Sequence, residues 1–278
     1  MTNSVNSNLG AIVALQNLNA INAALSQTQS RINTGLKISS AKDNGAIWAI
    51  AQNQRSDVSA LEAVKDSLNR GQSTIEVSIS ASETISDLLN QMKQKALAAT
   101  DASLDTTSRL ALNDDFKALR NQIAKTVASA SFNGVNLLKT AATNLTALSE
   151  ATGASKLTAV AQIMGLGAAG SVLTIAATST FQTATQASTI LGLINTSITN
   201  VNAAVAKLGV SAKSFELQNI FVSKLSDVLT NGIGNLVDAD VAKESANLTA
   251  LQTKQQLGIQ ALSIANQAPS ILMSLFRG

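Results

Sequence analysis

The C-terminal stretch from Ile233 to Gly278 reads IGNLVDADVAKESANLTALQTKQQLGIQALSIANQAPSILMSLFRG. Asp238 and Asp240 stand where negative charge favours the start of a helix. Beyond them, apolar residues recur at helical spacing, at Val241, Leu248, Leu251, Ile259, Leu262 and Ile264. No neighbouring segment is available to cover this stripe. We therefore expect the last helix to pair with a helix from the opposite end of the chain.

The N-terminal segment, residues 9–32, carries a seven-residue repeat that suits such a partner. Its two sets of heptad positions hold Ala11, Leu18, Leu25 and Ile32, and Ala14, Ile21 and Thr28. This spacing predicts a coiled-coil seam. The opposite face is polar but uncharged, whereas a water-facing coiled coil flanks its seam with Glu and Lys. We expect this helix to be packed on several sides.

Composition favours long helices and disfavours catalysis. Hydrophobic residues make up 45% of the 278 residues and aromatic residues 3%, and Pro269 is the only proline, which favours a mainly α fold. The chain has no cysteine and no histidine, so it lacks disulfides, thiolate metal sites and the commonest general base. We expect no enzymatic activity and no cofactor.

Charge is sparse at both ends. The first charged side chain is Arg31, and none occurs between Lys254 and Arg277. Free solvated tails normally carry charge. Because these two ends carry almost none, we expect them to be buried in an assembly. The net charge is only +3 without a basic stripe, which argues against nucleic-acid binding. The C-terminal run is interrupted by amides and Pro269, which argues against membrane insertion, and the N-terminus lacks the features of a cleavable signal peptide.

Between the ends, turn formers divide the chain into helices. Residues 33–44, NTGLKISSAKDN, predict a non-helical connector. Helices are expected from about residue 47 to Gly71, from about residue 73 to a break at residues 101–107, and from about residue 190 to a stop at Gly232 and Gly234. A further helix is expected after the break at 101–107, with Leu112, Phe116, Leu119 and Ile123 on one face. Asn133-Gly134 predicts a tight turn. Residues 140–206 hold only Glu150 and Lys156 as charges. About forty of these residues are predicted to form loops and one or two hairpins, with a β-like piece at 172–176.

Three patterns that mimic chemical sites have simpler explanations. Gly165, Gly167 and Gly170 match the dinucleotide fingerprint, but no acid for a ribose follows, so a turn is favoured. The acids from Asp238 to Glu244 lack the Gly and Glu of a calcium loop and fit helix capping. Asp114 and Asp115 are adjacent and diverge on a helix, so they do not form a catalytic pair. We expect no metal site.

Several motifs together resemble the bacterial flagellins, in particular the short alphaproteobacterial kind. They are SVNSNLGA from Ser4, INTGLKISSAKDN from Ile32, FNGVNLL from Phe132 and the closing run from Leu236. The resemblance covers roughly residues 1–139 and 203–278. It implies a subunit that polymerises into the flagellar filament for motility, outside the cell, and that is exported without a cleavable signal. It also implies, as partners, other copies of itself, other flagellins, the export apparatus and the junction and cap proteins.

The resemblance also implies a division of the chain. Residues 1–43 and 236–278 would form a terminal coiled coil, residues 44–138 and 187–235 an elongated antiparallel helical rod, and residues 139–186 a variable insert with a small β-hairpin. The predicted assembly interface comprises Leu18, Ile21, Leu25, Ile32, Leu248, Leu251, Leu262, Leu275 and Phe276. The predicted connector residues are Gly35, Lys37, Lys42 and Asp43.

One departure from the family bears on innate immunity. Flagellins that the animal innate receptor senses carry an arginine and a glutamate where this chain has Gln91 and Gln94, so we expect weak recognition. Two other functions stay open. A hook–filament junction protein would have similar termini but would be made in far fewer copies. A membrane-active protein would usually show Lys or Arg on its polar faces.

Overall fold

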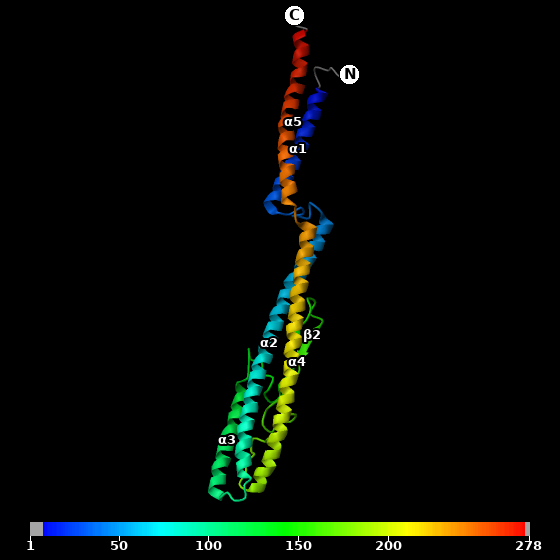
Figure 1. The fold of residues 1–278 in the computed structure, drawn as a ribbon. Coiled ribbons are helices and arrows are strands. Elements are labelled where there is room, and N and C mark those ends of the chain that lie inside the picture. Colours follow the sequence, from blue (N-terminus) through cyan, green and yellow to red (C-terminus); the bar gives the residue numbers. More distant parts are fainter. Residues whose placement is uncertain (1–7, 276–278) are drawn as a thin grey trace. The chain divides into compact units, whose positions relative to one another are not determined.

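The computed structural model describes residues 8–275, with side chains to Gln267 (Figure 1). Its elements are α1 (Leu9–Thr34), α2 (Gly45–Ala99), α3 (Thr106–Ser129), β1 (Leu145–Leu148), β2 (Lys156–Ala159), α4 (Ala184–Val237) and α5 (Val241–Leu275). The prediction of a mainly α fold with a small β-hairpin is confirmed. The chain forms two compact units: a terminal unit, residues 1–56 and 228–278, and a central unit, residues 57–227. The finer predicted subdivision stays a prediction.

Short polar side chains cap the starts of three helices, and the cap at Asp240 lies where the sequence predicted one. Asn8 accepts a hydrogen bond from the backbone N–H of Ala11 at the start of α1. Asp105 accepts from Thr107 and Ser108 at the start of α3. Asp240 accepts from Lys243 at the start of α5 (3.1 Å). Each cap satisfies a backbone donor that the first turn leaves without a partner.

Two predicted helix breaks are wrong, because glycine does not interrupt these helices. Helix α2 runs without a break through Gly71, and α4 runs through Gly232 and Gly234 to Val237. A helical glycine costs about 1 kcal/mol relative to alanine, which tertiary packing offsets. At Gly71 the reason is visible: a Cβ there would overlap Cε1 of the Phe215 ring. The glycine leaves room for an aromatic side chain from α4.

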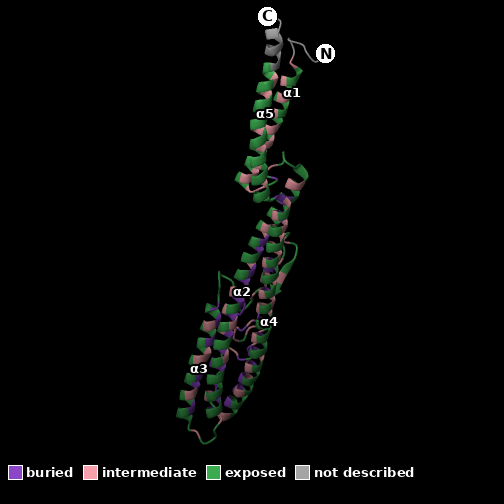
Figure 2. Ribbon diagram, turned by 45° about the horizontal axis from the view of Figure 1, so that its top comes forward, coloured by how far each residue is buried: buried purple, intermediate pink, exposed green. Residues whose placement is uncertain are grey.

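The core of the central unit lies between α2, α3 and α4, where Figure 2 shows buried residues along the inner faces. The helical stripes predicted for these segments are largely buried. The largest fully buried side chains from the three helices are Leu68, Ile75, Ile85, Leu89, Met92, Phe116, Ile123 and Phe215. Phe181, from the segment before α4, adds an aromatic contact to Phe116 with ring centroids 5.2 Å apart. Helix periodicity alone identified most of this core.

The insert contains one two-stranded antiparallel sheet in the described chain. Strand β1 pairs with β2 so that Leu145 faces Ala159 and Leu148 faces Lys156. The predicted β-like piece at residues 172–176 is wrong: it forms no strand. Its backbone instead bonds to a neighbouring loop and to side chains of α4, as where Thr174 N–H donates to Ser197 Oγ (3.0 Å). Short apolar runs do not distinguish strands from such packed loops.

The predicted tight turn at Asn133-Gly134 is confirmed. Both residues have positive φ, 48° and 78°, as a type I′ turn requires. The flanking residues Phe132 and Val135 exchange two backbone hydrogen bonds of 2.9 and 3.0 Å. The Asn136 side chain donates a hydrogen bond to the carbonyl of Val127, which attaches the turn to the end of α3. Its oxygen accepts hydrogen bonds from the backbone N–H groups of Leu138 and Lys139.

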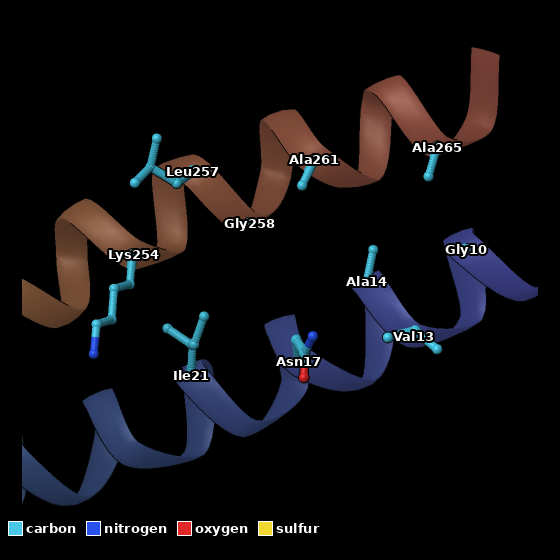
Figure 3. Close-up of a pocket in the computed structure, with 10 residues that line it drawn as sticks. All are labelled: Gly10, Val13, Ala14, Asn17, Ile21, Lys254, Leu257, Gly258, Ala261 and Ala265. Atoms are coloured by element: carbon cyan, nitrogen blue, oxygen red, sulfur yellow. The ribbon is translucent and has the colours of Figure 1, made fainter. Parts of the chain in front are cut away.

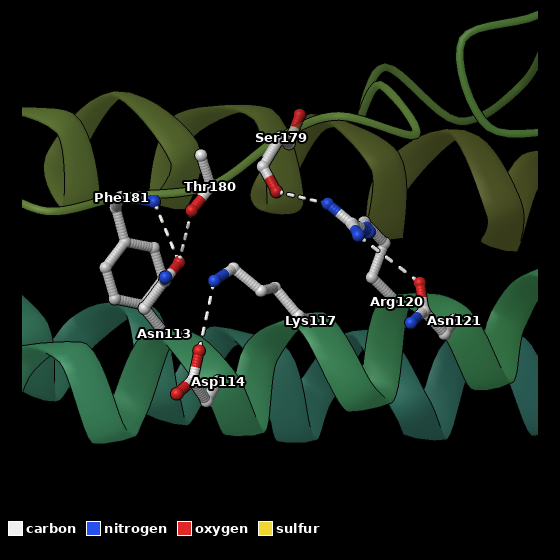
Figure 4. A network of polar contacts seen from close by, with 8 residues as sticks. All are labelled: Asn113, Asp114, Lys117, Arg120, Asn121, Ser179, Thr180 and Phe181. Atoms are coloured by element: carbon white, nitrogen blue, oxygen red, sulfur yellow. Dashed lines mark hydrogen bonds and ion pairs between the residues drawn. The ribbon is translucent and has the colours of Figure 1, made fainter.

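Buried polar contacts hold the segment before α4 against α3 (Figure 4). The Asn113 side-chain oxygen accepts hydrogen bonds from Thr180 Oγ1 (2.7 Å) and from the backbone N–H of Phe181 (3.0 Å). Arg120 donates to the carbonyl of Ser179 (2.6 Å). Asn113 is 1% exposed, so an unpaired amide would be costly there. These bonds fix the segment that carries Phe181 into the core.

Candidate assembly interface

Helix α1 presents its predicted heptad seam to α5. The positions that the repeat selected are half-buried or buried, and the intervening positions are mostly exposed. The seam residues are Ala11, Ala14, Leu18, Ile21, Leu25, Thr28 and Ile32. Among them, Leu18 and Ile21 lie against the backbone of Gly258, whose Cβ, if present, would meet their Cδ1 atoms at 3.4 and 3.8 Å. The N-terminal helix thus pairs with the C-terminal helix, as the two stripes suggested.

Helix α5 presents a seam that the apolar pattern identified only in part. Its half-buried residues are spaced alternately by four and three, and they are Glu244, Leu248, Leu251, Gln255, Gly258, Leu262 and Ala265. The predicted Leu248, Leu251 and Leu262 lie on it. The prediction that Val241, Ile259 and Ile264 share this face is wrong, because all three are exposed. Three seam positions hold Glu, Gln and Gly, which a count of apolar residues does not find.

Three polar contacts set the antiparallel alignment of α1 and α5. Asn8 Nδ2 donates to the carbonyl of Ala265 (2.6 Å). Gln255 Nε2 donates to Asn22 Oδ1 (2.7 Å). Arg31 forms an ion pair with Glu244 (3.1 Å), whose side chain is only 12% exposed. Directional bonds at both ends and in the middle penalise any slip of one helix along the other.

An open groove of about 460 Å³ runs between α1 and α5 (Figure 3). Small residues at its base leave it unfilled: Gly10, Ala14, Gly258, Ala261 and Ala265. Val13 and Leu257 stand on its two sides. An unfilled apolar groove forgoes contacts that a complementary surface could provide.

The outer faces of both terminal helices expose large apolar side chains. Ile12 is 58% exposed and Leu257 is 59% exposed. The others are Leu9, Val13 and Leu15 on α1, and Val241, Ile259 and Ile264 on α5. Charge is nearly absent: α1 carries only Arg31, and α5 carries Lys243, Glu244 and Lys254. Exposed apolar side chains that gather on one part of a protein surface mark an interaction site.

The same apolar character bears on membranes. Length and a mean hydropathy of 1.2 would by themselves allow α1 to cross a bilayer. Its seam, however, lies against α5, and Asn8 and Asn22 form hydrogen bonds to that helix. Pairing with α5 therefore accounts for the apolar residues of the seam but not for the exposed Leu9, Ile12, Val13 and Leu15. The absence of membrane insertion stays a prediction.

The connector after α1 is tied to the junction between α4 and α5. Gly35 ends α1 with φ 70°, a conformation that favours glycine. The Lys37 N–H donates to the carbonyl of Val237 (2.7 Å), and the Ala239 N–H donates to the carbonyl of Gly35 (2.8 Å). Lys42 is exposed. The predicted non-helical connector, here residues 35–44, thus has a defined backbone path.

Asp43 holds the second half of this connector. Its carboxylate accepts hydrogen bonds from the backbone and hydroxyl groups of Ser39 and Ser40, at 3.0–3.2 Å. The bond from the Ser40 N–H, followed by those from Ser39, lowers the pKa of Asp43 below its ordinary value of 3.8. Hydrogen bonds to the charged form stabilise it. Asp43 is therefore a structural anion.

Of the remaining predicted residues, Gln91 and Gln94 lie exposed on α2, and weak receptor recognition stays a prediction. Leu275 is the last residue of α5, but its side chain lies outside the described part, and Phe276 lies outside the described residues altogether. Their predicted role as an end anchor is untested.

No chemical site emerges within residues 8–275. No group of three or more acidic side chains that would hold a metal ion occurs in this range. Gly167 and Gly170 have positive φ and lie in turns that no helix follows, which agrees with the turn interpretation. Asp114 pairs with Lys117, and Asp115 pairs with Lys95, at the surface. The acids thus serve as surface ion pairs.

Comparisons with known proteins agree with this architecture. Residues 5–143 match the bacterial flagellin N-terminal helical region, and residues 191–276 match the C-terminal helical region. Flagellin FljM of Caulobacter vibrioides is 54% identical over 99% of both chains. A flagellin of Brucella melitensis is 36% identical over 99% of both chains.

A solved Vibrio parahaemolyticus structure described as a flagellar hook-associated protein shares the fold, with a TM-score of 0.58 and 13% identity. It covers 70% of this chain and all of that one. At this identity the similarity shows the fold alone and does not favour the junction alternative. The full-length relatives are flagellins, which are structural proteins and not enzymes. The chain therefore belongs to the bacterial flagellin family, in its alphaproteobacterial form, as a structural subunit of the flagellar filament.

Proposed function

We propose that the outer faces of α1 and α5 are the surfaces through which this flagellin polymerises. The observation that carries the proposal is the set of large apolar side chains, Ile12 and Leu257 among them, that one copy leaves exposed on both helices. The predicted seam residues support this surface from within, since Leu18, Ile21 and Leu262 hold the two helices together. Polymerisation would then bury the apolar side chains that stay exposed in a single chain.

The energetics favour this role. Burying a whole Leu or Ile side chain contributes about 1.5–3 kcal/mol, so covering the exposed half of one contributes about 1 kcal/mol. The two helices expose six Leu or Ile side chains and two Val side chains. A filament repeats the same contact in every subunit, so even partial coverage outweighs the cost of fixing each subunit in place. The groove beside Gly258 would admit a side chain from a neighbouring copy.

The proposed location is the extracellular flagellar filament, reached by export without a cleavable signal. The proposed partners are further copies of this chain and related flagellins, together with the export apparatus and the junction and cap proteins. The uncharged ends support burial among like surfaces, because charged groups would oppose close packing of identical copies.

A pair of variants on the outer faces tests the proposal. Ile12→Gln and Leu257→Gln replace exposed apolar side chains and leave the seam intact. We expect circular dichroism and thermal unfolding of the single chain to be unchanged, and filament growth on seeds to be lost or strongly reduced in sedimentation and electron microscopy. Asn19→Gln, at an exposed polar position of α1, is the matched control. Growth of both variants at wild-type concentrations would show that these faces are not the contact.

A further inference from the structure

Three asparagines of this chain are followed directly by glycine: Asn44, Asn133 and Asn231. In such a pair the backbone nitrogen of the glycine can attack the side-chain carbonyl carbon of the asparagine, because glycine has no side chain to obstruct the approach. No neighbouring group lies within 4 Å of the position that a Cβ would take at any of the three glycines. Steric crowding therefore does not distinguish the three pairs, whereas their hydrogen bonds do.

The pairs at Asn44 and Asn231 are restrained by helices. The side-chain oxygen of Asn44 caps α2, since it accepts a hydrogen bond from the N–H of Ile47 (3.1 Å). Attack on this side chain requires the loss of the cap, which slows the reaction about 2- to 30-fold. Asn231 and Gly232 lie inside α4, where a backbone N–H is bonded to the carbonyl four residues earlier. Attack by the Gly232 nitrogen therefore requires the helix to open locally.

The pair at Asn133 and Gly134 carries no such restraint. The turn is closed by backbone hydrogen bonds between Phe132 and Val135, so its two central residues take no part in them. Within residues 8–275, no hydrogen bond engages the Asn133 side chain or the Gly134 N–H. Both residues are exposed, so water reaches them. Attack by the Gly134 nitrogen therefore breaks no hydrogen bond of either reacting group.

We propose that Asn133 is the site at which this chain deamidates. The Gly134 nitrogen loses its proton and bonds to Cγ of Asn133, and the Nδ2 group leaves with a proton as ammonia, which gives a cyclic succinimide. Water then adds to one of the two carbonyl carbons of the ring, and the bond from that carbon to the nitrogen breaks. Cleavage at Cγ leaves aspartate at position 133, and cleavage at the main-chain carbonyl carbon leaves isoaspartate. The net reaction consumes one water and releases one ammonia.

The aspartate product suits the turn. Aspartate followed by glycine is among the pairs that a type I′ turn favours. Asn133 also lines a pocket of about 210 Å³ together with Arg70, which forms no ion pair within residues 8–275. A carboxylate at position 133 thus arises beside a guanidinium that has no carboxylate partner. Exposed ion pairs contribute little, so we expect this product to leave the stability of the chain nearly unchanged.

The isoaspartate product does not suit the turn. It carries the main chain through Cβ and Cγ of residue 133 and so adds one carbon atom to the link between Phe132 and Val135. The two backbone bonds between these residues, of 2.9 and 3.0 Å, depend on an ordinary two-residue connection. We therefore expect isoaspartate to break the turn. Either product lowers the net charge of the chain from +3 to +2, so charge separates modified from unmodified chains.

Incubation of the unpolymerised full-length chain at mildly alkaline pH tests the site. Peptide mapping by mass spectrometry detects the gain of about 1 Da at each asparagine. We expect Asn133 to react at least about threefold faster than Asn44 and at least about tenfold faster than Asn231. In urea the protecting bonds are absent, so the three rates should agree to within about threefold. Equal rates in the folded chain, or a faster reaction at either other asparagine, would overturn the inference.

Variants test the site and its products by isoelectric focusing and thermal unfolding. Asn133→Gly removes the amide but keeps a pair that a type I′ turn accepts, so most of the charge-shifted form should disappear; its accumulation at the wild-type rate would show that another residue reacts. Asn44→Ser, which retains a capping oxygen, is the matched control and should leave that form unchanged. Asn133→Asp should keep the wild-type Tm to within about 4 °C, and a larger loss would contradict the accommodation of aspartate. None of these measurements involves polymerisation, so they stand apart from the proposed function.

Discussion

Replacing Gly71 with alanine sets two effects of similar size against each other. Gly71 lies inside the unbroken helix α2, where alanine is favoured over glycine by about 1 kcal/mol. Helix propensity alone therefore predicts that Gly71→Ala stabilises the protein. Glycine also gives the unfolded chain more backbone conformations than alanine does. Alanine therefore lowers the conformational entropy that the chain loses on folding.

Packing predicts the opposite sign. The added Cβ would overlap Cε1 of Phe215, lie 3.0 Å from Cδ1 of the same ring, and lie 3.6 Å from the Cβ of Ala147. Phe215 is fully buried, so its ring has no free space to enter. Overfilling a packed core costs about 1–3 kcal/mol. Subtracting the gain in helix propensity leaves a net destabilisation of up to about 2 kcal/mol.

Thermal unfolding of the unpolymerised chain, followed by circular dichroism, measures the balance. For a unit of this size we expect Gly71→Ala to lower Tm by up to about 8 °C. Gly209→Ala is the matched control, because Gly209 is a helical glycine of α4 with no atom near its missing Cβ. It should gain about 1 kcal/mol and raise Tm. If both variants raise Tm equally, Phe215 does not require the glycine, and the packing argument fails.

Three further predictions concern polar groups. Arg31→Met leaves the nearly buried carboxylate of Glu244 without its ion pair and should lower the free energy of unfolding of the α1–α5 pair by about 1–3 kcal/mol; urea unfolding measures it, and Lys42→Met, at an exposed position, is the control. Asn113→Ala removes the acceptor for Thr180 and the Phe181 amide and should cost about 1–3 kcal/mol; an unchanged urea midpoint would contradict the assigned bonds. Hydrogen bonds from Ser108 and then Thr107 lower the pKa of Asp105 below 3.8, so its stabilisation is present above that pH and is lost as the pH falls below it. Asp105→Asn should therefore reduce the dependence of Tm on pH between about 5 and 2.5, and an unaltered dependence would assign the acid sensitivity to other groups.

Local pattern in the sequence determined much of this fold. The heptad from Ala11 to Ile32 identified the apolar seam residues of α1, because a side chain's face depends only on its position in a regular helix. The turn at Asn133-Gly134 was equally local, since few residue pairs accept positive φ at both positions. The two uncharged, apolar ends also indicated a pairing of terminal helices before any contact was known.

Other features were decided by contacts between distant segments. Helix α2 continues through Gly71 because a phenylalanine from α4 fills the space that a side chain would occupy. The seam of α5 passes through Glu244, Gln255 and Gly258 because α1 supplies an arginine, an asparagine and two apolar side chains opposite them. A polar or absent side chain becomes a suitable seam residue only once its partner is in place.

The same reasoning separates the two faces of each terminal helix. The sequence determined that these helices are apolar and uncharged, since composition and spacing are properties of the chain itself. Only the tertiary structure decided which apolar residues α1 and α5 use against each other and which they leave exposed, such as Ile12 and Leu257. A helix with apolar residues on more than one side satisfies several pairings equally well by pattern, and side-chain packing selects among them.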